Sequence, residues 1–75
     1  MKGELRVMGR EGDTKVMWDS DNDLEVETAK ESFDKLVGKG YAAFKVKKNG
    51  DQGARVKEFD ADAEMLILVP PMAGG

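Results

Sequence analysis

The residue types that carry most enzyme chemistry are missing from this chain. Its 75 residues include no cysteine and no histidine, which excludes a Ser-His-Asp triad, a cysteine nucleophile and a Cys/His metal site. Asp19, Asp21 and Asp23 alternate like the start of a calcium-binding loop, but Leu24 stands where that loop requires glycine. We therefore predict that the chain is not an enzyme and holds no metal, and we interpret the aspartates as helix-capping residues.

The end of the sequence, residues 70–75, is the other chemically notable segment. Gly74 and Gly75 have no side chains, so they can pass through a channel too narrow for a Cβ atom and adopt backbone angles closed to other residues. Pro70 and Pro71 cannot donate to a sheet, and they stiffen the chain in an extended form. The same segment also fits an ordinary frayed terminus, which is often small and disordered.

The composition is that of one small globular domain with a charged surface. Hydrophobic residues make up 40% of the chain, charged residues 36%, and the formal net charge is -3. A mildly acidic chain is a poor partner for nucleic acid, which requires a basic face. No apolar run approaches the ~20 residues of a membrane span, and the N-terminus lacks the apolar stretch of a signal peptide. We expect a cytoplasmic protein with neither nucleic acid nor membrane as partner.

Alternating apolar residues predict a first β-hairpin, with strands over residues 4–8 and 14–18 and a glycine-rich turn at 9–13. One face of this hairpin holds four apolar residues: Leu5, Val7, Val16 and Trp18. Met8 and Met17 fall on the opposite face by the same alternation. If a helix covers the first face, these two methionines lie on the open one, where they either form a docking patch or simply fill the sheet surface.

An amphipathic helix follows the Asp/Asn-rich segment. Asn22 and Glu25 have the spacing of a capping box, with Asn in place of Ser or Thr. The next apolar residues recur every three or four positions and share one stripe: Val26, Ala29, Phe33, Leu36 and Val37. Either Gly38 or Gly40 is expected to end the helix in a left-handed conformation.

The second half of the chain predicts three more strands. Residues 41–47 and 54–59 are expected to form a hairpin around a turn at 48–51, with the charged second strand at an edge. Residues 65–69 are apolar at every position, which predicts a central strand buried on both faces. A hairpin, a helix, a hairpin and a central strand together predict an α+β fold of the β-grasp type. Four to five strands would form a mixed sheet with one helix on one face.

The last 14 residues, Asp62 to Gly75, resemble the C-terminus of the small sulfur-carrier subunit of molybdopterin synthase, the MoaD family. That family typically ends in an acidic pair, an apolar strand, two prolines, two small or apolar residues and a diglycine. The thiamine sulfur carriers (ThiS) and archaeal ubiquitin-like modifiers share this end and the ubiquitin-like β-grasp. The N-terminal half departs from the MoaD pattern. It has a tight glycine-rich hairpin, and its helix follows an Asp/Asn-rich segment.

The resemblance implies a β-grasp domain over residues 1–69 and a flexible tail over 70–75. An E1-like adenylating enzyme would use ATP to activate the Gly75 carboxyl, with no cofactor bound to the chain itself. Sulfur transfer would then give a thiocarboxylate for a sulfur-acceptor enzyme. The residues expected to contact the partner's channel are those that precede the diglycine: Pro70, Pro71, Met72 and Ala73.

Two other functions are consistent with the same sequence. The chain resembles ubiquitin-like modifiers closely enough that Gly75 would alternatively be joined to target-protein lysines through an isopeptide bond. It would otherwise be a non-covalent β-grasp binding module that uses its open sheet face. The carrier and the modifier require the diglycine, whereas the binding module does not.

Overall fold

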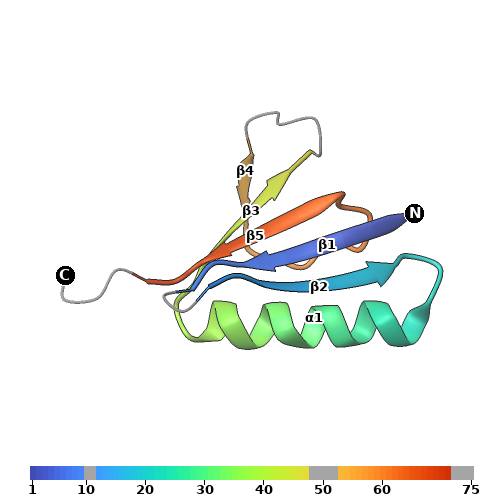
Figure 1. Ribbon diagram of the computed structural model, residues 1–75, viewed down its shortest axis with the longest axis horizontal. Coiled ribbons are helices and arrows are strands. Elements are labelled where there is room, and N and C mark those ends of the chain that lie inside the picture. Colours follow the sequence, from blue (N-terminus) through green and yellow to red (C-terminus); the bar gives the residue numbers. More distant parts are fainter. Residues whose placement is uncertain (10–11, 48–52, 72–75) are drawn as a thin grey trace.

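The computed structural model describes residues 1–9, 12–47 and 53–71, and it confirms the predicted order of elements (Figure 1). In chain order these are β1 (Lys2–Val7), β2 (Thr14–Asp19), α1 (Asp23–Gly38), β3 (Ala42–Val46), β4 (Ala54–Val56) and β5 (Met65–Val69). β1 begins two residues earlier than predicted, and β4 ends three residues earlier. The predicted turn at 48–51 and residues 10–11 of the first turn lie outside the described residues.

The five strands form one mixed sheet in the order β2-β1-β5-β3-β4. β1 pairs with β2, and β3 pairs with both β4 and β5, in antiparallel fashion. β5 lies beside β1 and runs parallel to it. The central position of β5 and the edge position of β4 are therefore confirmed, and the arrangement is an α+β, β-grasp-like fold with one helix packed on the sheet.

The start of α1 confirms the predicted cap, with one change of partner. The Asn22 Oδ1 atom accepts from the backbone N–H of Leu24 at 3.1 Å and of Glu25 at 3.2 Å. The backbone N–H of Asn22 already donates to the Asp19 carbonyl at 2.9 Å. The Glu25 carboxylate therefore reaches further back, accepting from the Asp19 N–H at 2.9 Å and from Asn22 Nδ2 at 3.2 Å. Helix and β2 are thus tied together at this corner.

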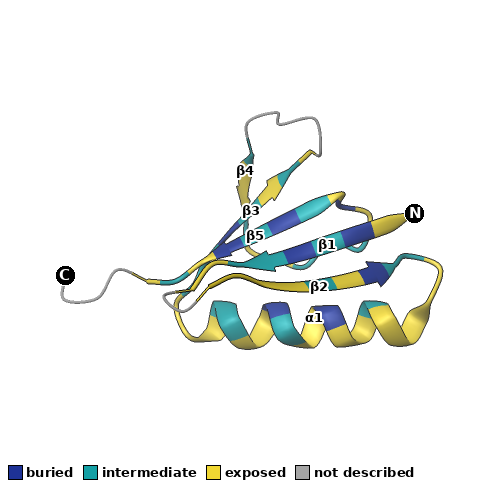
Figure 2. Ribbon diagram, in the orientation of Figure 1, coloured by how far each residue is buried: buried dark blue, intermediate teal, exposed yellow. Residues whose placement is uncertain are grey.

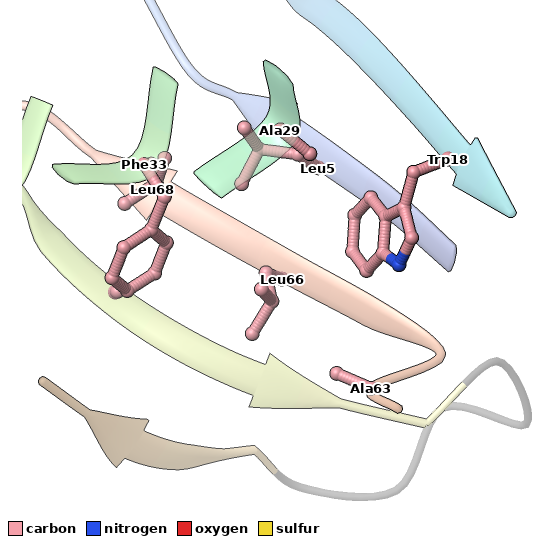
Figure 3. Close-up of a cluster of buried hydrophobic side chains, with 8 residues drawn as sticks. Leu5, Trp18, Ala29, Phe33, Ala63, Leu66 and Leu68 are labelled. Atoms are coloured by element: carbon pink, nitrogen blue, oxygen red, sulfur yellow. The ribbon is translucent and has the colours of Figure 1, made fainter. Parts of the chain in front are cut away.

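The helix stripe and one face of the sheet form the core (Figure 3). Ala29 and Phe33 of α1 are completely buried, and the other apolar residues of the predicted stripe are partly buried against the core. The sheet and the chain between β4 and β5 contribute the remaining buried side chains: Leu5, Trp18, Ala43, Ala63, Leu66 and Leu68.

The prediction that β5 is buried on both faces is wrong. Leu66 and Leu68 are fully buried, but Met65 and Ile67 are only half-buried and Val69 is 38% exposed (Figure 2). The reason is that the fold has one helix, which covers one face of the sheet. The apolar side chains on the other face of β5 belong to an open surface.

Candidate functional site

The proposed tail begins where β5 leaves the sheet. β5 ends at Val69, and Pro70 and Pro71 follow as half-buried and exposed residues. Met72, Ala73, Gly74 and Gly75 lie outside the described residues. In Figure 1, β5 carries the chain toward the end of the molecule opposite the N-terminus. The structure therefore presents the base of the tail at one end of the central strand.

Three neighbouring segments hold the base of the tail. The Met8 N–H donates to the Leu68 carbonyl at 2.9 Å, which continues the β1–β5 pairing beyond Val7. Val69 is paired with Ala42 of β3. A Cβ atom at Gly40 would lie 3.6 Å from two ring carbons of Pro71, so the proline ring lies beside this glycine. The path of the chain is thus defined as far as Pro71.

The loop between α1 and β3 owes its shape to Gly40. Of the two glycines predicted to end the helix, Gly40 has the positive φ, at 99°. The N–H of Lys39 donates to Leu36, and that of Gly40 to Val37, both at 3.0 Å. Tyr41 N–H also donates to the Leu36 carbonyl, at 3.1 Å. These bonds satisfy carbonyls that the last helical turn leaves open, and they fix Gly40 close to the exit of the tail.

The open face of the sheet is the second candidate site. Strand alternation and pairing place Met17, Glu4, Met65 and Val46 in one row across it, next to a row with Arg6, Ile67, Phe44 and Arg55. The two methionines predicted for this face are exposed, Met17 at 59% and Met8 at 38%. Their predicted position is confirmed, and the surface they share extends over β5 and β3.

An ion pair at the middle of this face was not predicted. Arg6 Nη2 lies 3.1 Å from Glu4 Oε2, while the side chains are only 32% and 13% exposed. Arg6 Nε and Glu4 Oε2 are buried, yet among the described residues neither has a partner in hydrogen-bond geometry. The sequence signal was available, because Glu4 and Arg6 alternate with the buried Leu5 and therefore share one face of the strand.

The charges of the open face differ in sign from those of the whole chain. The net charge of the chain is -3. By strand alternation, the described strand residues on this face include four cations and two carboxylates: Lys2, Arg6, Lys15, Arg55, Glu4 and Asp19. The described strand residues of this face therefore carry a net positive charge, whereas the chain as a whole is acidic.

The interpretation of Asp19, Asp21 and Asp23 as helix-capping residues holds only in part, because the side chain that caps α1 is that of Asn22. Asp19 Oδ1 accepts from the Asp21 N–H at 3.0 Å, and this bond keeps the pKa of the Asp19 carboxyl below its usual value. Asp23 lies in the first helical turn, where the helix dipole favours a negative charge. The positions of Asp19 and Asp23 are thus explained by a turn hydrogen bond and by the helix dipole.

A separate hollow lies between Lys45, Val56 and the segment 57–61. Its main charges neutralise each other, because Lys45 Nζ lies 2.7 Å from Asp60 Oδ2. This bond raises the pKa of Lys45 and lowers that of Asp60, which also accepts from the Asp62 N–H at 2.9 Å. The pair joins β3 to the segment that follows β4, and it compensates two of the charged groups that line the hollow.

Within the described part of the chain, no helix is long and apolar enough to cross a membrane. Comparison with protein-family models found no matching family, and comparisons with curated proteins and with solved structures found no significant match.

Proposed function

We propose that the chain is a ubiquitin-like sulfur carrier whose terminal carboxyl is activated by a separate E1-like adenylating enzyme. The supporting observation is that the central strand β5 delivers the chain to one end of the sheet, where its path is held as far as Pro71. In the sequence, Gly74 and Gly75 are the third and fourth residues beyond this anchored base. The proposal requires the Gly75 carboxyl group to lie outside the folded domain, where it can enter another protein's active site.

The chemistry needs no catalytic side chain from this protein. A Gly75 carboxylate oxygen attacks the α-phosphorus of ATP, pyrophosphate leaves, and the carboxyl becomes an acyl-adenylate. A sulfide-level sulfur donor supplied by the partner system then attacks the carbonyl carbon, and AMP leaves. The product is a thiocarboxylate. In the modifier alternative, a lysine amine displaces the activating group instead and an isopeptide bond forms.

Intact-mass analysis tests this proposal directly. The wild-type chain is incubated with ATP, a sulfur donor and an E1-like enzyme from the same organism that supports ATP–pyrophosphate exchange on it. A carrier gains the mass difference between sulfur and oxygen, whereas a modifier appears as an adduct linked through Gly75. Deleting Gly75 should abolish both products, and Glu31→Ala at an exposed position of α1 is the matched control. Persistence of either product without Gly75 would contradict the proposal.

A second candidate function is non-covalent binding through the open face. The observation that favours it is the Arg6 Nε group, which is buried without a hydrogen-bond partner among the described residues. Leaving a buried donor unpaired costs about 1–3 kcal/mol, which favours a change of the Arg6 side-chain conformation toward an acceptor on a partner. The face is apolar and net positive, so its partner would be a protein surface with apolar side chains around a carboxylate.

The two functions respond differently to two variants. Binding through the open face is lost in Arg6→Gln and kept when Gly74 and Gly75 are deleted. Carrier activity requires the diglycine in every case. The affinity of an identified protein partner, measured by calorimetry for both variants, distinguishes them, and an unchanged affinity in Arg6→Gln would exclude the open-face candidate.

A further inference from the structure

We infer that Gly40 is a positioning residue for the tail, and that it acts by seating the ring of Pro71. This inference rests on the proposed function, because it concerns how the same tail is presented to the activating enzyme. Gly40 lies 35 positions before the end of the sequence, and it comes from the helix–strand loop rather than from the tail's own strand. Gly40 would therefore act on the Gly75 carboxyl through its position beside the tail and not through the chain sequence.

The seat, meaning the place beside Gly40 where the ring of Pro71 lies, is restricted from both the loop and the tail. On the loop side, the backbone N–H groups of Lys39, Gly40 and Tyr41 all donate to the last turn of α1, so Gly40 cannot move without breaking helix-end hydrogen bonds. On the tail side, the rings of Pro70 and Pro71 restrict φ to a narrow range. A Cβ atom at Gly40 would stand 3.6 Å from the Cβ and Cγ atoms of Pro71. The ring of Pro71 therefore lies next to the space that a side chain at Gly40 would occupy.

The conformation of the loop explains why the position is glycine. The φ of +99° is one that L side chains rarely adopt. The space beside Pro71 would admit a methyl group, so the constraint comes from the backbone and not from a clash. A side chain at Gly40 would therefore shift the loop, and Gly40 would move away from the ring of Pro71.

In the proposed function, the contact with Gly40 moves the last anchored residue from Val69 to Pro71. Without it, the last anchored residue would be Val69, which is paired with Ala42, and six residues would follow. With it, four residues follow Pro71, and a fully extended chain of that length spans about 13–14 Å. The ATP site of the activating enzyme must then lie within that distance of the α1–β3 loop, so this loop faces the partner.

Loss of the seat should weaken capture of the tail more than the chemical step. A freer tail loses more conformational entropy when it enters the partner's channel, whereas the bound carboxyl and ATP are unchanged once it is inside. We expect KM for the carrier protein to rise about threefold to tenfold in ATP–pyrophosphate exchange, with kcat nearly unchanged.

Pro71→Ala and Pro70→Ala form the matched pair for the experiment. Each variant removes one proline and the same amount of stiffness, but only Pro71 lies beside Gly40. In the free wild-type protein, NMR should show a nuclear Overhauser effect between the Gly40 Hα and Pro71 ring protons. Amide relaxation should report faster motion of Gly74 in Pro71→Ala than in Pro70→Ala. The absence of that proton contact, or equal motion in both variants, would overturn the seat.

A second pair addresses the loop itself. Gly40→Ala and Gly12→Ala both place a side chain at positive φ, but a Cβ at Gly12 has nothing within 4 Å. The rise in KM should follow Gly40→Ala and Pro71→Ala only. If the seat is present by NMR and KM stays constant in both variants, the positioning role is refuted. If the wild-type chain is not adenylated at all, the carrier proposal fails, and the NMR measurements still decide whether the seat exists.

Discussion

The indole ring of Trp18 lies directly against the backbone of Gly3, its partner across the β1–β2 pair. A methyl group at Gly3 would overlap the six-membered part of the ring and approach the Ala63 carbonyl to 2.8 Å. The indole N–H donates to the Ala61 carbonyl at 3.0 Å, and the residue is 1% exposed. Trp18 thus joins the first hairpin to the segment between β4 and β5, and the missing side chain at Gly3 makes room for it.

Gly3→Ala should lower the free energy of unfolding by about 2–3 kcal/mol, because overpacking forces the ring or the strand to shift. Urea unfolding followed by Trp18 fluorescence and by circular dichroism measures the loss. Gly38→Ala is the control, since a Cβ there meets nothing within 4 Å and the residue is helical. It should be neutral or stabilising by about 0.5–1 kcal/mol. Equal stabilities for the two variants would contradict the packing described here.

Asn22→Ala should destabilise the fold by about 1 kcal/mol, because two N–H groups of the first helical turn lose their acceptor. The Glu25 carboxylate also loses its bond to Asn22 Nδ2. Asp21→Ala changes a side chain that is 91% exposed, and it should stay within about 0.5 kcal/mol of wild type. Thermal and urea unfolding of both variants provide the comparison. An Asn22→Ala protein as stable as Asp21→Ala would argue against the cap.

The Lys45–Asp60 pair should make stability depend on pH at both ends of the range. Asp60 has a lowered pKa in the fold, so its contribution is present above about pH 4 and is lost as the pH falls through the folded value. Lys45 has a raised pKa, so its contribution is present below about pH 10 and is lost as the pH rises through the folded value. Asp60→Asn should remove both dependences.

The measurement is the difference in Tm between wild type and Asp60→Asn as a function of pH at low salt. The difference should be largest near neutrality and should shrink toward acid. Lys47→Gln is the control, because Lys47 is a neighbouring exposed lysine without an ion pair to Asp60. A Tm difference that stays constant down to strongly acidic pH would show that the carboxylate charge is not what stabilises this contact.

Removing one partner of the Glu4–Arg6 pair should harm the free domain more than removing both. Arg6→Met leaves a mostly buried carboxylate without its cation, with an expected loss of about 1–3 kcal/mol. The double variant Glu4→Leu, Arg6→Met replaces the pair by apolar groups and should equal or exceed wild type in stability. Urea unfolding of the three proteins tests this order. A double variant that is less stable than Arg6→Met would mean that the pair stabilises the free domain.

The order of elements could be predicted because local patterns decided it. Alternation marked the first hairpin, and the three-and-four spacing through Ala29 and Phe33 marked the helix face that the structure buries. The early end of β4 could not be predicted. Phe59 leaves the strand direction to place its ring 5.0 Å from that of Trp18 and 5.9 Å from that of Phe33. That contact joins residues far apart in the sequence and overrides the local strand preference.

The exposure of one face of β5 could not be predicted from its sequence. A continuous apolar strand such as residues 65–69 is compatible with burial on two faces, and only the number of covering elements decides between one and two. The described residues form one helix, so Ile67 and Val69 remain partly exposed. Likewise, the spacing of Gly38 and Gly40 allowed either residue to end the helix, and the position of Pro71 relative to Gly40 required the assembled sheet.

Deleting residues 72–75 should leave the fold intact while abolishing activation. Among the described residues, the pairing of β5 ends at Val69, and the last contact at the base of the proposed tail is that of Pro71 with Gly40. The free energy of unfolding should therefore change by less than about 0.5 kcal/mol. Urea unfolding, with the Trp18 signal as reporter, measures stability, and intact-mass analysis measures activation in the same preparation. A loss of several kcal/mol would mean that the last four residues pack on the domain, and a packed end is not free to enter another enzyme's active site.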